Sequence, residues 1–127
     1  MRTRPRFGLL FLTALALSAC IPDTRQAVLK SALAGVNIIR GGFATWDVAH
    51  QQQIVTKATS AEDGKAQLAG YRQAREKVTL AFEIAYKLLA MAAFDLTEAN
   101  IGTALHAVGD IYDLVRKLTG GAVAGGP

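Results

Sequence analysis

No proline occurs between Pro22 and Pro127, and this absence limits the fold of the chain more than any other feature. Proline disrupts the interior of an α-helix, so no residue from 23 to 126 forbids helical structure. Alternating runs of β-branched residues, which would indicate strands, are missing, whereas apolar residues recur at three- and four-residue steps. The sequence therefore predicts an all-α fold.

The first predicted helix begins at Asp23 or Thr24, either of which can cap free amide groups. Its apolar stripe comprises Leu29, Ala32, Val36, Ile39, Phe43, Trp46 and His50, widened by Leu33 and Ile54. Gly41 and Gly42 cost about 1 kcal/mol each in a helix interior. Because the apolar period runs through them unbroken, we expect a continuous helix that is kinked or closely packed at this point.

Two further helices follow from the same spacing. Thr59-Ser60-Ala61-Glu62 fits a capping box that starts the second helix. The apolar face of that helix comprises Leu68, Tyr71, Val78, Phe82, Ala85, Leu89 and Ala92, and the apolar segment 88–94 should be the most buried part of the domain. The third helix is capped by Asp95 or Thr97 and ends at Gly120. Its stripe comprises Ile101, Ala104, Val108, Ile111, Val115 and Leu118.

A short connection joins the first two helices, which makes them antiparallel neighbours. The expected architecture is a long two-helix hairpin with the third helix packed along one end, a three-helix bundle over residues 24–119. Residues 120–127 should form a flexible glycine-rich tail. Counting outward from a turn near residue 59 places Trp46 opposite the level of Tyr71.

The first residues have the organisation of an export signal. Arg2, Arg4 and Arg6 precede an apolar run at 7–17, which as a helix would reach about 16 Å, half the thickness of a bilayer core. That length is too short to span stably, but it suits the apolar region of a signal peptide. The alternatives are an ordinary transmembrane anchor or a buried helix with a chance cysteine.

The tetrapeptide that follows this run, Leu17-Ser18-Ala19-Cys20, contains the only cysteine and resembles the lipobox of bacterial lipoproteins. The resemblance implies that a diacylglyceryl group is attached to the Cys20 sulfur. It also implies signal cleavage between Ala19 and Cys20, with acylation, such as by palmitate, of the new amino terminus in many species. The mature protein would then be held to a membrane by lipid on Cys20.

This resemblance divides the chain and suggests a location. Residues 1–19 would be the signal peptide and 20–23 the lipidated N terminus and a short linker. Ile21 is not the aspartate that is associated with inner-membrane retention in this family. The expected location is therefore the cell envelope, at the outer membrane facing the periplasm or the surface if the host has two membranes.

The net charge of the precursor is +4, but most of this charge belongs to the signal. Removing three arginines from the fourteen basic residues leaves eleven against ten acidic residues, a net charge of +1. Nucleic-acid binding requires a concentrated basic face, so we expect no nucleic-acid partner.

Antiparallel pairing brings a set of aromatic, acidic, imidazole and guanidinium groups to one region of the hairpin. This candidate partner-binding patch comprises Trp46, Asp47, His50, Tyr71, Arg72 and Arg75. Its surroundings, 43–53 and 71–75, resemble small uncharacterised helical proteins of bacteria and phages, a resemblance that implies no activity. The structural alternative is a core tryptophan with an Asp47–Arg pair that only fixes the helix register.

Two pairs of residues could bind a metal ion. Asp47 and His50 are spaced i, i+3, and His106 and Asp110 are spaced i, i+4, with Glu83 as the one plausible additional inward carboxylate. Neither pair has the Glu-x-x-His form of di-metal bundles, so we assign no metal site.

No nucleophile elbow, phosphate-binding loop or zinc cluster is present in the sequence, and we expect neither an enzyme nor a cofactor. The leading hypothesis is a non-enzymatic helical module that binds an envelope protein or polymer, with self-association also open. The alternatives are a phage or prophage lipoprotein that acts in lysis or superinfection exclusion, and a metal-binding bundle.

Overall fold

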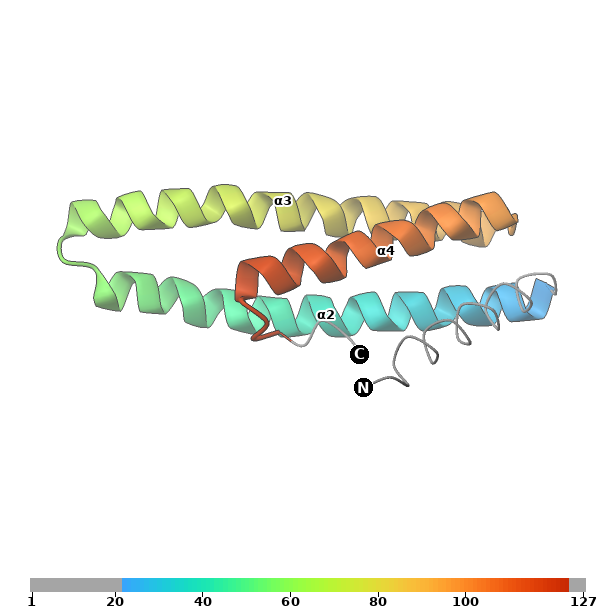
Figure 1. Ribbon diagram of the computed structural model, residues 1–127, viewed down its shortest axis with the longest axis horizontal. Coiled ribbons are helices and arrows are strands. Elements are labelled where there is room, and N and C mark those ends of the chain that lie inside the picture. Colours follow the sequence, from blue (N-terminus) through green and yellow to red (C-terminus); the bar gives the residue numbers. More distant parts are fainter. Residues whose placement is uncertain (1–21, 124–127) are drawn as a thin grey trace, which may run out of the picture.

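The structure is a computed structural model that describes residues 22–123, with side chains from Thr24 onward. α2 spans Pro22–Lys57, α3 spans Ala61–Phe94 and α4 spans Glu98–Thr119. Figure 1 shows α2 and α3 antiparallel, with α4 returning beside the N-terminal half of α2 and the C-terminal half of α3. The predicted all-α three-helix bundle is confirmed for this region. The expected signal peptide lies outside the described residues.

The turn between α2 and α3 has a capping box, but one residue later than the sequence suggested. The N-cap is Ser60, whose hydroxyl accepts a hydrogen bond from the Asp63 N–H at 3.1 Å. The Asp63 carboxylate accepts one from the Thr59 N–H at 3.1 Å, which lowers the pKa of Asp63, with a further contribution from Gln67. Asp63 thus has the role expected of Glu62, because the N-cap is Ser60 rather than Thr59 and Asp63 is the third residue after it.

The ends of α4 agree with the sequence. Thr97 is the N-cap and its hydroxyl accepts a hydrogen bond from the Asn100 N–H at 3.1 Å. Gly120 ends the helix with a φ of 61°, a left-handed conformation that side chains disfavour.

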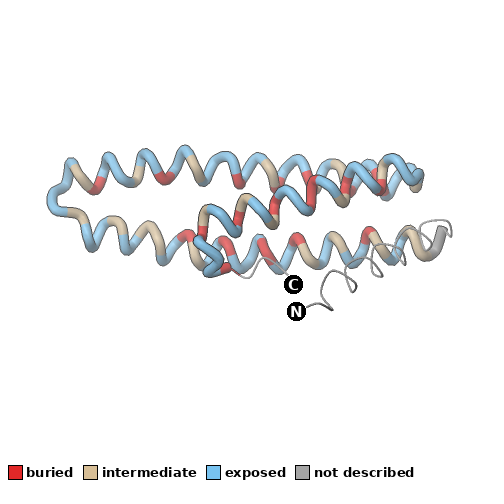
Figure 2. Tube along the Cα trace, viewed as in Figure 1, coloured by how far each residue is buried: buried red, intermediate tan, exposed pale blue. Residues whose placement is uncertain are grey.

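The core lies where all three helices meet. Its buried members include Leu29, Val36, Ile39 and Phe43 from α2, Val78, Phe82, Ala85, Leu89 and Ala92 from α3, and Ile101, Ala104, Val108, Ile111 and Val115 from α4. These are the residues that the apolar stripes predicted. Figure 2 shows that few buried positions remain where the hairpin extends past α4.

The prediction that segment 88–94 is the most buried part of the domain is wrong. Met91 is 53% exposed and Phe94 is 96% exposed. Both lie on the side of α3 away from its helical neighbours, because α2 and α4 cover only one side of that helix. Leu33, expected to widen the stripe of α2, is also 40% exposed.

α2 is continuous through Gly41 and Gly42, as predicted. A side-chain carbon at Gly42 would lie 3.3 Å from the Val123 side chain, whereas one at Gly41 would meet nothing within 4 Å. Gly42 therefore allows the chain that follows α4 to approach α2 closely. Val123 is buried, so the loose tail that was predicted from residue 120 does not begin there.

Candidate functional site

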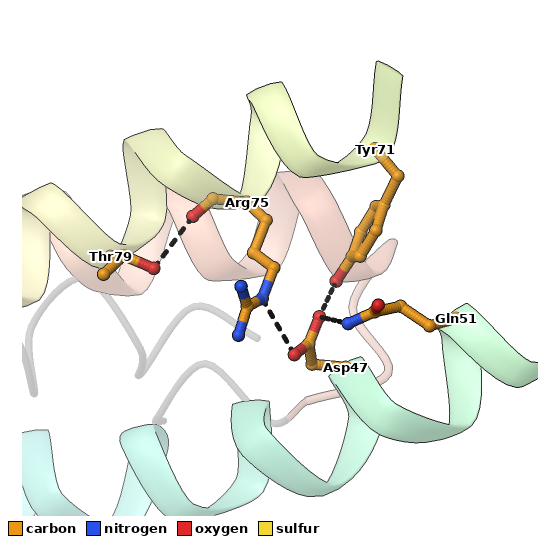
Figure 3. A network of polar contacts seen from close by, with 5 residues as sticks. All are labelled: Asp47, Gln51, Tyr71, Arg75 and Thr79. Carbon is orange, nitrogen blue, oxygen red and sulfur yellow. Dashed lines mark hydrogen bonds and ion pairs between the residues drawn. The ribbon is translucent and has the colours of Figure 1, made fainter. Parts of the chain in front are cut away.

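A buried carboxylate joins α2 to α3 near the middle of the hairpin. Asp47 is 4% exposed and accepts three hydrogen bonds, as Figure 3 shows. Its Oδ1 accepts from the Tyr71 hydroxyl at 2.6 Å and from the Gln51 amide at 3.1 Å, and its Oδ2 accepts from Arg75 Nε at 2.9 Å.

Helical spacing brings these groups together. Gln51 follows Asp47 by four residues on α2, and Arg75 follows Tyr71 by four residues on α3, so each pair shares a helix face. The Arg75 side chain is 45% exposed, which leaves part of its guanidinium at the surface. The carboxylate charge is compensated by this arginine and by two neutral donors, as a buried charge requires.

Burial raises the pKa of the Tyr71 phenol above its ordinary value of 10.0. The hydrogen bond to Asp47 and the negative charge of that carboxylate raise it further, and the Arg75 charge opposes them. Tyr71 therefore stays protonated in the folded chain at a pH at which a free tyrosine ionises.

This difference predicts a loss of stability in alkali. Above pH 10 the unfolded chain releases the Tyr71 proton while the folded chain keeps it, so the free energy of unfolding falls by about 1.4 kcal/mol per pH unit. Urea unfolding between about pH 9 and 11 should show a shallower decline in Tyr71→Phe than in the wild type. Parallel declines in the two proteins would contradict the raised pKa.

An aromatic ladder runs beside the carboxylate. The Trp46 ring is stacked on the His50 ring with centroids 4.4 Å apart, and the Tyr71 ring lies 6.0 Å from Trp46 and 4.7 Å from His50. Phe43 continues the ladder toward the core, 6.1 Å from Trp46. Trp46 and His50 are half-buried, so their rings are partly open to solvent. The predicted opposition of Trp46 and Tyr71 is confirmed.

The patch that the sequence suggested is therefore assembled in part. Trp46, His50 and Tyr71 are in ring contact and Arg75 is bonded to Asp47, whereas Arg72 lies exposed on the next position of α3. Asp47 itself is an internal partner and offers little to a ligand. The Asp47–Arg75 pair of the structural alternative is present, and beside it lie the half-buried rings of Trp46 and His50 and the exposed Arg72.

A groove between α2 and α3 adjoins the Asp47–Arg75 pair. The buried rings of Phe43 and Phe82 line it together with the exposed side chains of Arg40 and Glu83. Neither this groove nor the role of Gln51 was predicted from the sequence. The spacing of four residues from Asp47 was the signal that could have identified Gln51.

Neither of the two candidate metal-ligand pairs is joined by a third ligand within residues 22–123. His106 Nε2 lies 3.7 Å from an Asp110 carboxylate oxygen, and both side chains are more than half exposed. Glu83, considered as an inward carboxylate, is exposed. Within residues 22–123 no three His, Cys, Asp or Glu side chains are grouped so that they could hold a metal ion.

Ala19 and Cys20, the predicted cleavage and lipidation site, lie outside the described residues. None of the three helices within 22–123 combines the length and the apolar character that a transmembrane span needs. No protein-family model matches the chain, and searches of curated proteins and of solved structures give no match either.

Proposed function

We propose that the mature protein is a non-enzymatic lipoprotein of the cell envelope, anchored by lipid on Cys20, whose bundle presents a partner-binding patch away from the membrane. The lipobox-like tetrapeptide at 17–20 supports the anchor. α2 begins at Pro22, two residues after Cys20, so the bundle would be joined to the lipid by a very short linker.

The observation that carries the binding role is the partly open ring stack of Trp46 and His50 on α2, next to Asp47. Tryptophan, tyrosine and arginine are the residues that most often dominate the energy of protein interfaces. Trp46, Arg72 and Arg75 are at least partly exposed in this patch, whereas Tyr71 is buried.

The position of the patch fits a partner outside the lipid headgroups. Trp46 lies 24 residues beyond Pro22 on one continuous helix, a distance of about 36 Å along its axis. Ring faces beside guanidinium groups favour a partner with flat or apolar groups next to anionic ones. The partner is then an envelope protein or polymer with that chemistry.

The anchor is tested by a Cys20→Ser variant of the full chain. The wild type should be processed, carry lipid on Cys20 by mass spectrometry, and stay in the membrane fraction after carbonate washing. Cys20→Ser should lose the lipid and leave that fraction, because the thiol is the acylated group. A Cys20→Ser protein that is processed at the same bond and remains membrane-bound would contradict the lipoprotein assignment.

The patch is tested by cross-linking the tagged, lipidated protein in its native envelope. Arg72→Glu should strongly reduce the yield of the cross-linked partner by reversing an exposed charge of the patch. Lys77→Glu is the matched control, since it makes the same charge change at an exposed position of the same helix. Equal loss, or no loss, in the two variants would contradict a binding role for this patch.

A further inference from the structure

The most exposed large apolar side chain of the described chain lies where α3 ends. Phe94 is 96% exposed, and Met91, one turn earlier, is 53% exposed. Together with Ala90 and Asn100 they line a shallow hollow at the α3–α4 connection. The described residues leave Phe94 almost wholly uncovered and Met91 about half-covered, although burial of apolar surface is the main stabilising term in folding.

This apolar pair lies at the end of the bundle from which the chain leads back to Cys20. The Arg25 guanidinium, in the first turn of α2, donates a hydrogen bond to the Leu96 carbonyl oxygen in the α3–α4 connection. Figure 1 shows the start of α2 and the α3–α4 connection at the same end. The first turn of α2 and the connection that follows Phe94 are therefore held side by side.

The linker to the anchor is too short to separate this end from a membrane. Two peptide units between Cys20 and Pro22 span at most about 7 Å. Arg25 follows Pro22 by three residues, about 4.5 Å along the helix. A lipid on Cys20 therefore brings the α3–α4 connection to the level of the bilayer surface.

We infer that Phe94 and Met91 form a lipid-contacting foot, on which the bundle stands end-on at the membrane. This inference rests on the proposed lipidation of Cys20. The contact is apolar and shallow, because the exposed Asp95 and Glu98 follow immediately and stay in the headgroup layer or in water. The exposed Lys87, one turn before Met91, can extend its amine to the lipid phosphates.

Two other arrangements would also cover this surface. The outer face of α3 also exposes Leu80 and Ile84, at 50% and 54%, so the helix could lie flat on the bilayer or pair with a second copy. Parallel pairing of two anchored copies along this stripe would bring Lys87 against its own copy. The labels at positions 80 and 94 in the experiment below distinguish a flat orientation from the end-on one.

Site-directed spin labelling of the lipidated full-length mature protein tests the foot. The chain has one cysteine, and lipid blocks it, so Phe94→Cys provides a single free thiol. Leu80→Cys and Val55→Cys are matched controls at other exposed apolar positions. Leu80 lies about 21 Å from Phe94 along α3, and Val55 lies near the far end of the hairpin. Circular dichroism checks that each variant keeps its helix content.

In phosphatidylcholine vesicles the label at position 94 should show several-fold lower accessibility to a water-soluble nickel complex, and higher accessibility to oxygen, than the labels at 80 and 55. Equal accessibility at all three positions, in protein whose lipid is verified by mass spectrometry, overturns the foot and leaves the anchor intact. Protection at 80 as well as 94 overturns the end-on orientation in favour of a flat one. Absence of lipid from Cys20 overturns both the proposed function and the foot.

Discussion

Ile111→Ala is expected to lower the free energy of unfolding by about 2–5 kcal/mol. Ile111 is 1% exposed on α4, in the section where all three helices contribute to the core. Removing its outer carbons leaves a cavity that neighbouring helices fill only in part. Small domains are stable by about 5–15 kcal/mol in total, so this loss is a large part of the whole. Urea unfolding followed by circular dichroism measures it.

The matched control is Ile38→Ala, the same substitution at a position of α2 that is 75% exposed. It should change the free energy of unfolding by no more than about 0.5 kcal/mol, because no cavity forms and alanine favours helix. Equal destabilisation by the two substitutions would contradict the arrangement of α4 against the hairpin.

Trp46→Ala is expected to have the second largest effect, a loss of about 2–3 kcal/mol. The value lies below that of a fully buried tryptophan because the ring is half-buried. Its contacts with the rings of Phe43, His50 and Tyr71 would all be lost. Thermal or urea unfolding of the variant beside the wild type measures the change.

His50→Ala is the control for this second prediction, with an expected loss well below that of Trp46→Ala. Trp46 packs against the buried core, whereas His50 is not among the side chains that do so and contacts the indole by stacking. If Trp46→Ala leaves the stability unchanged, the indole belongs to the exposed surface alone, and its role in the patch becomes the stronger interpretation.

The three helices were predictable because their apolar residues follow a regular period and their ends carry capping residues. Ser60 and Thr97 cap α3 and α4, and Gly120 ends α4 in a left-handed conformation. The pairing level of Trp46 and Tyr71 followed from the short turn between the two long helices. The local rules of helix formation and the tertiary arrangement agree in these places.

The exposure of Phe94 and the burial of Asp47 were not predictable from the same patterns. When a stretch is apolar on all sides, as 88–94 is, its sequence does not indicate which face the neighbouring helices will cover. Antiparallel pairing predicted Asp47 either in the partner-binding patch or in an Asp47–Arg pair that fixes the register, but it did not show that three donors from two helices would allow the carboxylate to be buried. Arg75 becomes a partner of Asp47 only once the hairpin register is set, whereas Gln51 lies four residues from Asp47 on the same helix.

The unequal lengths of the helices divide the molecule into parts of unequal local stability. α4 has 22 residues beside helices of 36 and 34, so the hairpin near its turn is packed as two helices only. Regions with few buried contacts open by sub-global unfolding well before the whole domain does. Backbone amides near the turn therefore exchange hydrogen faster than those beside α4, and a ligand that ordered the turn region would slow that exchange.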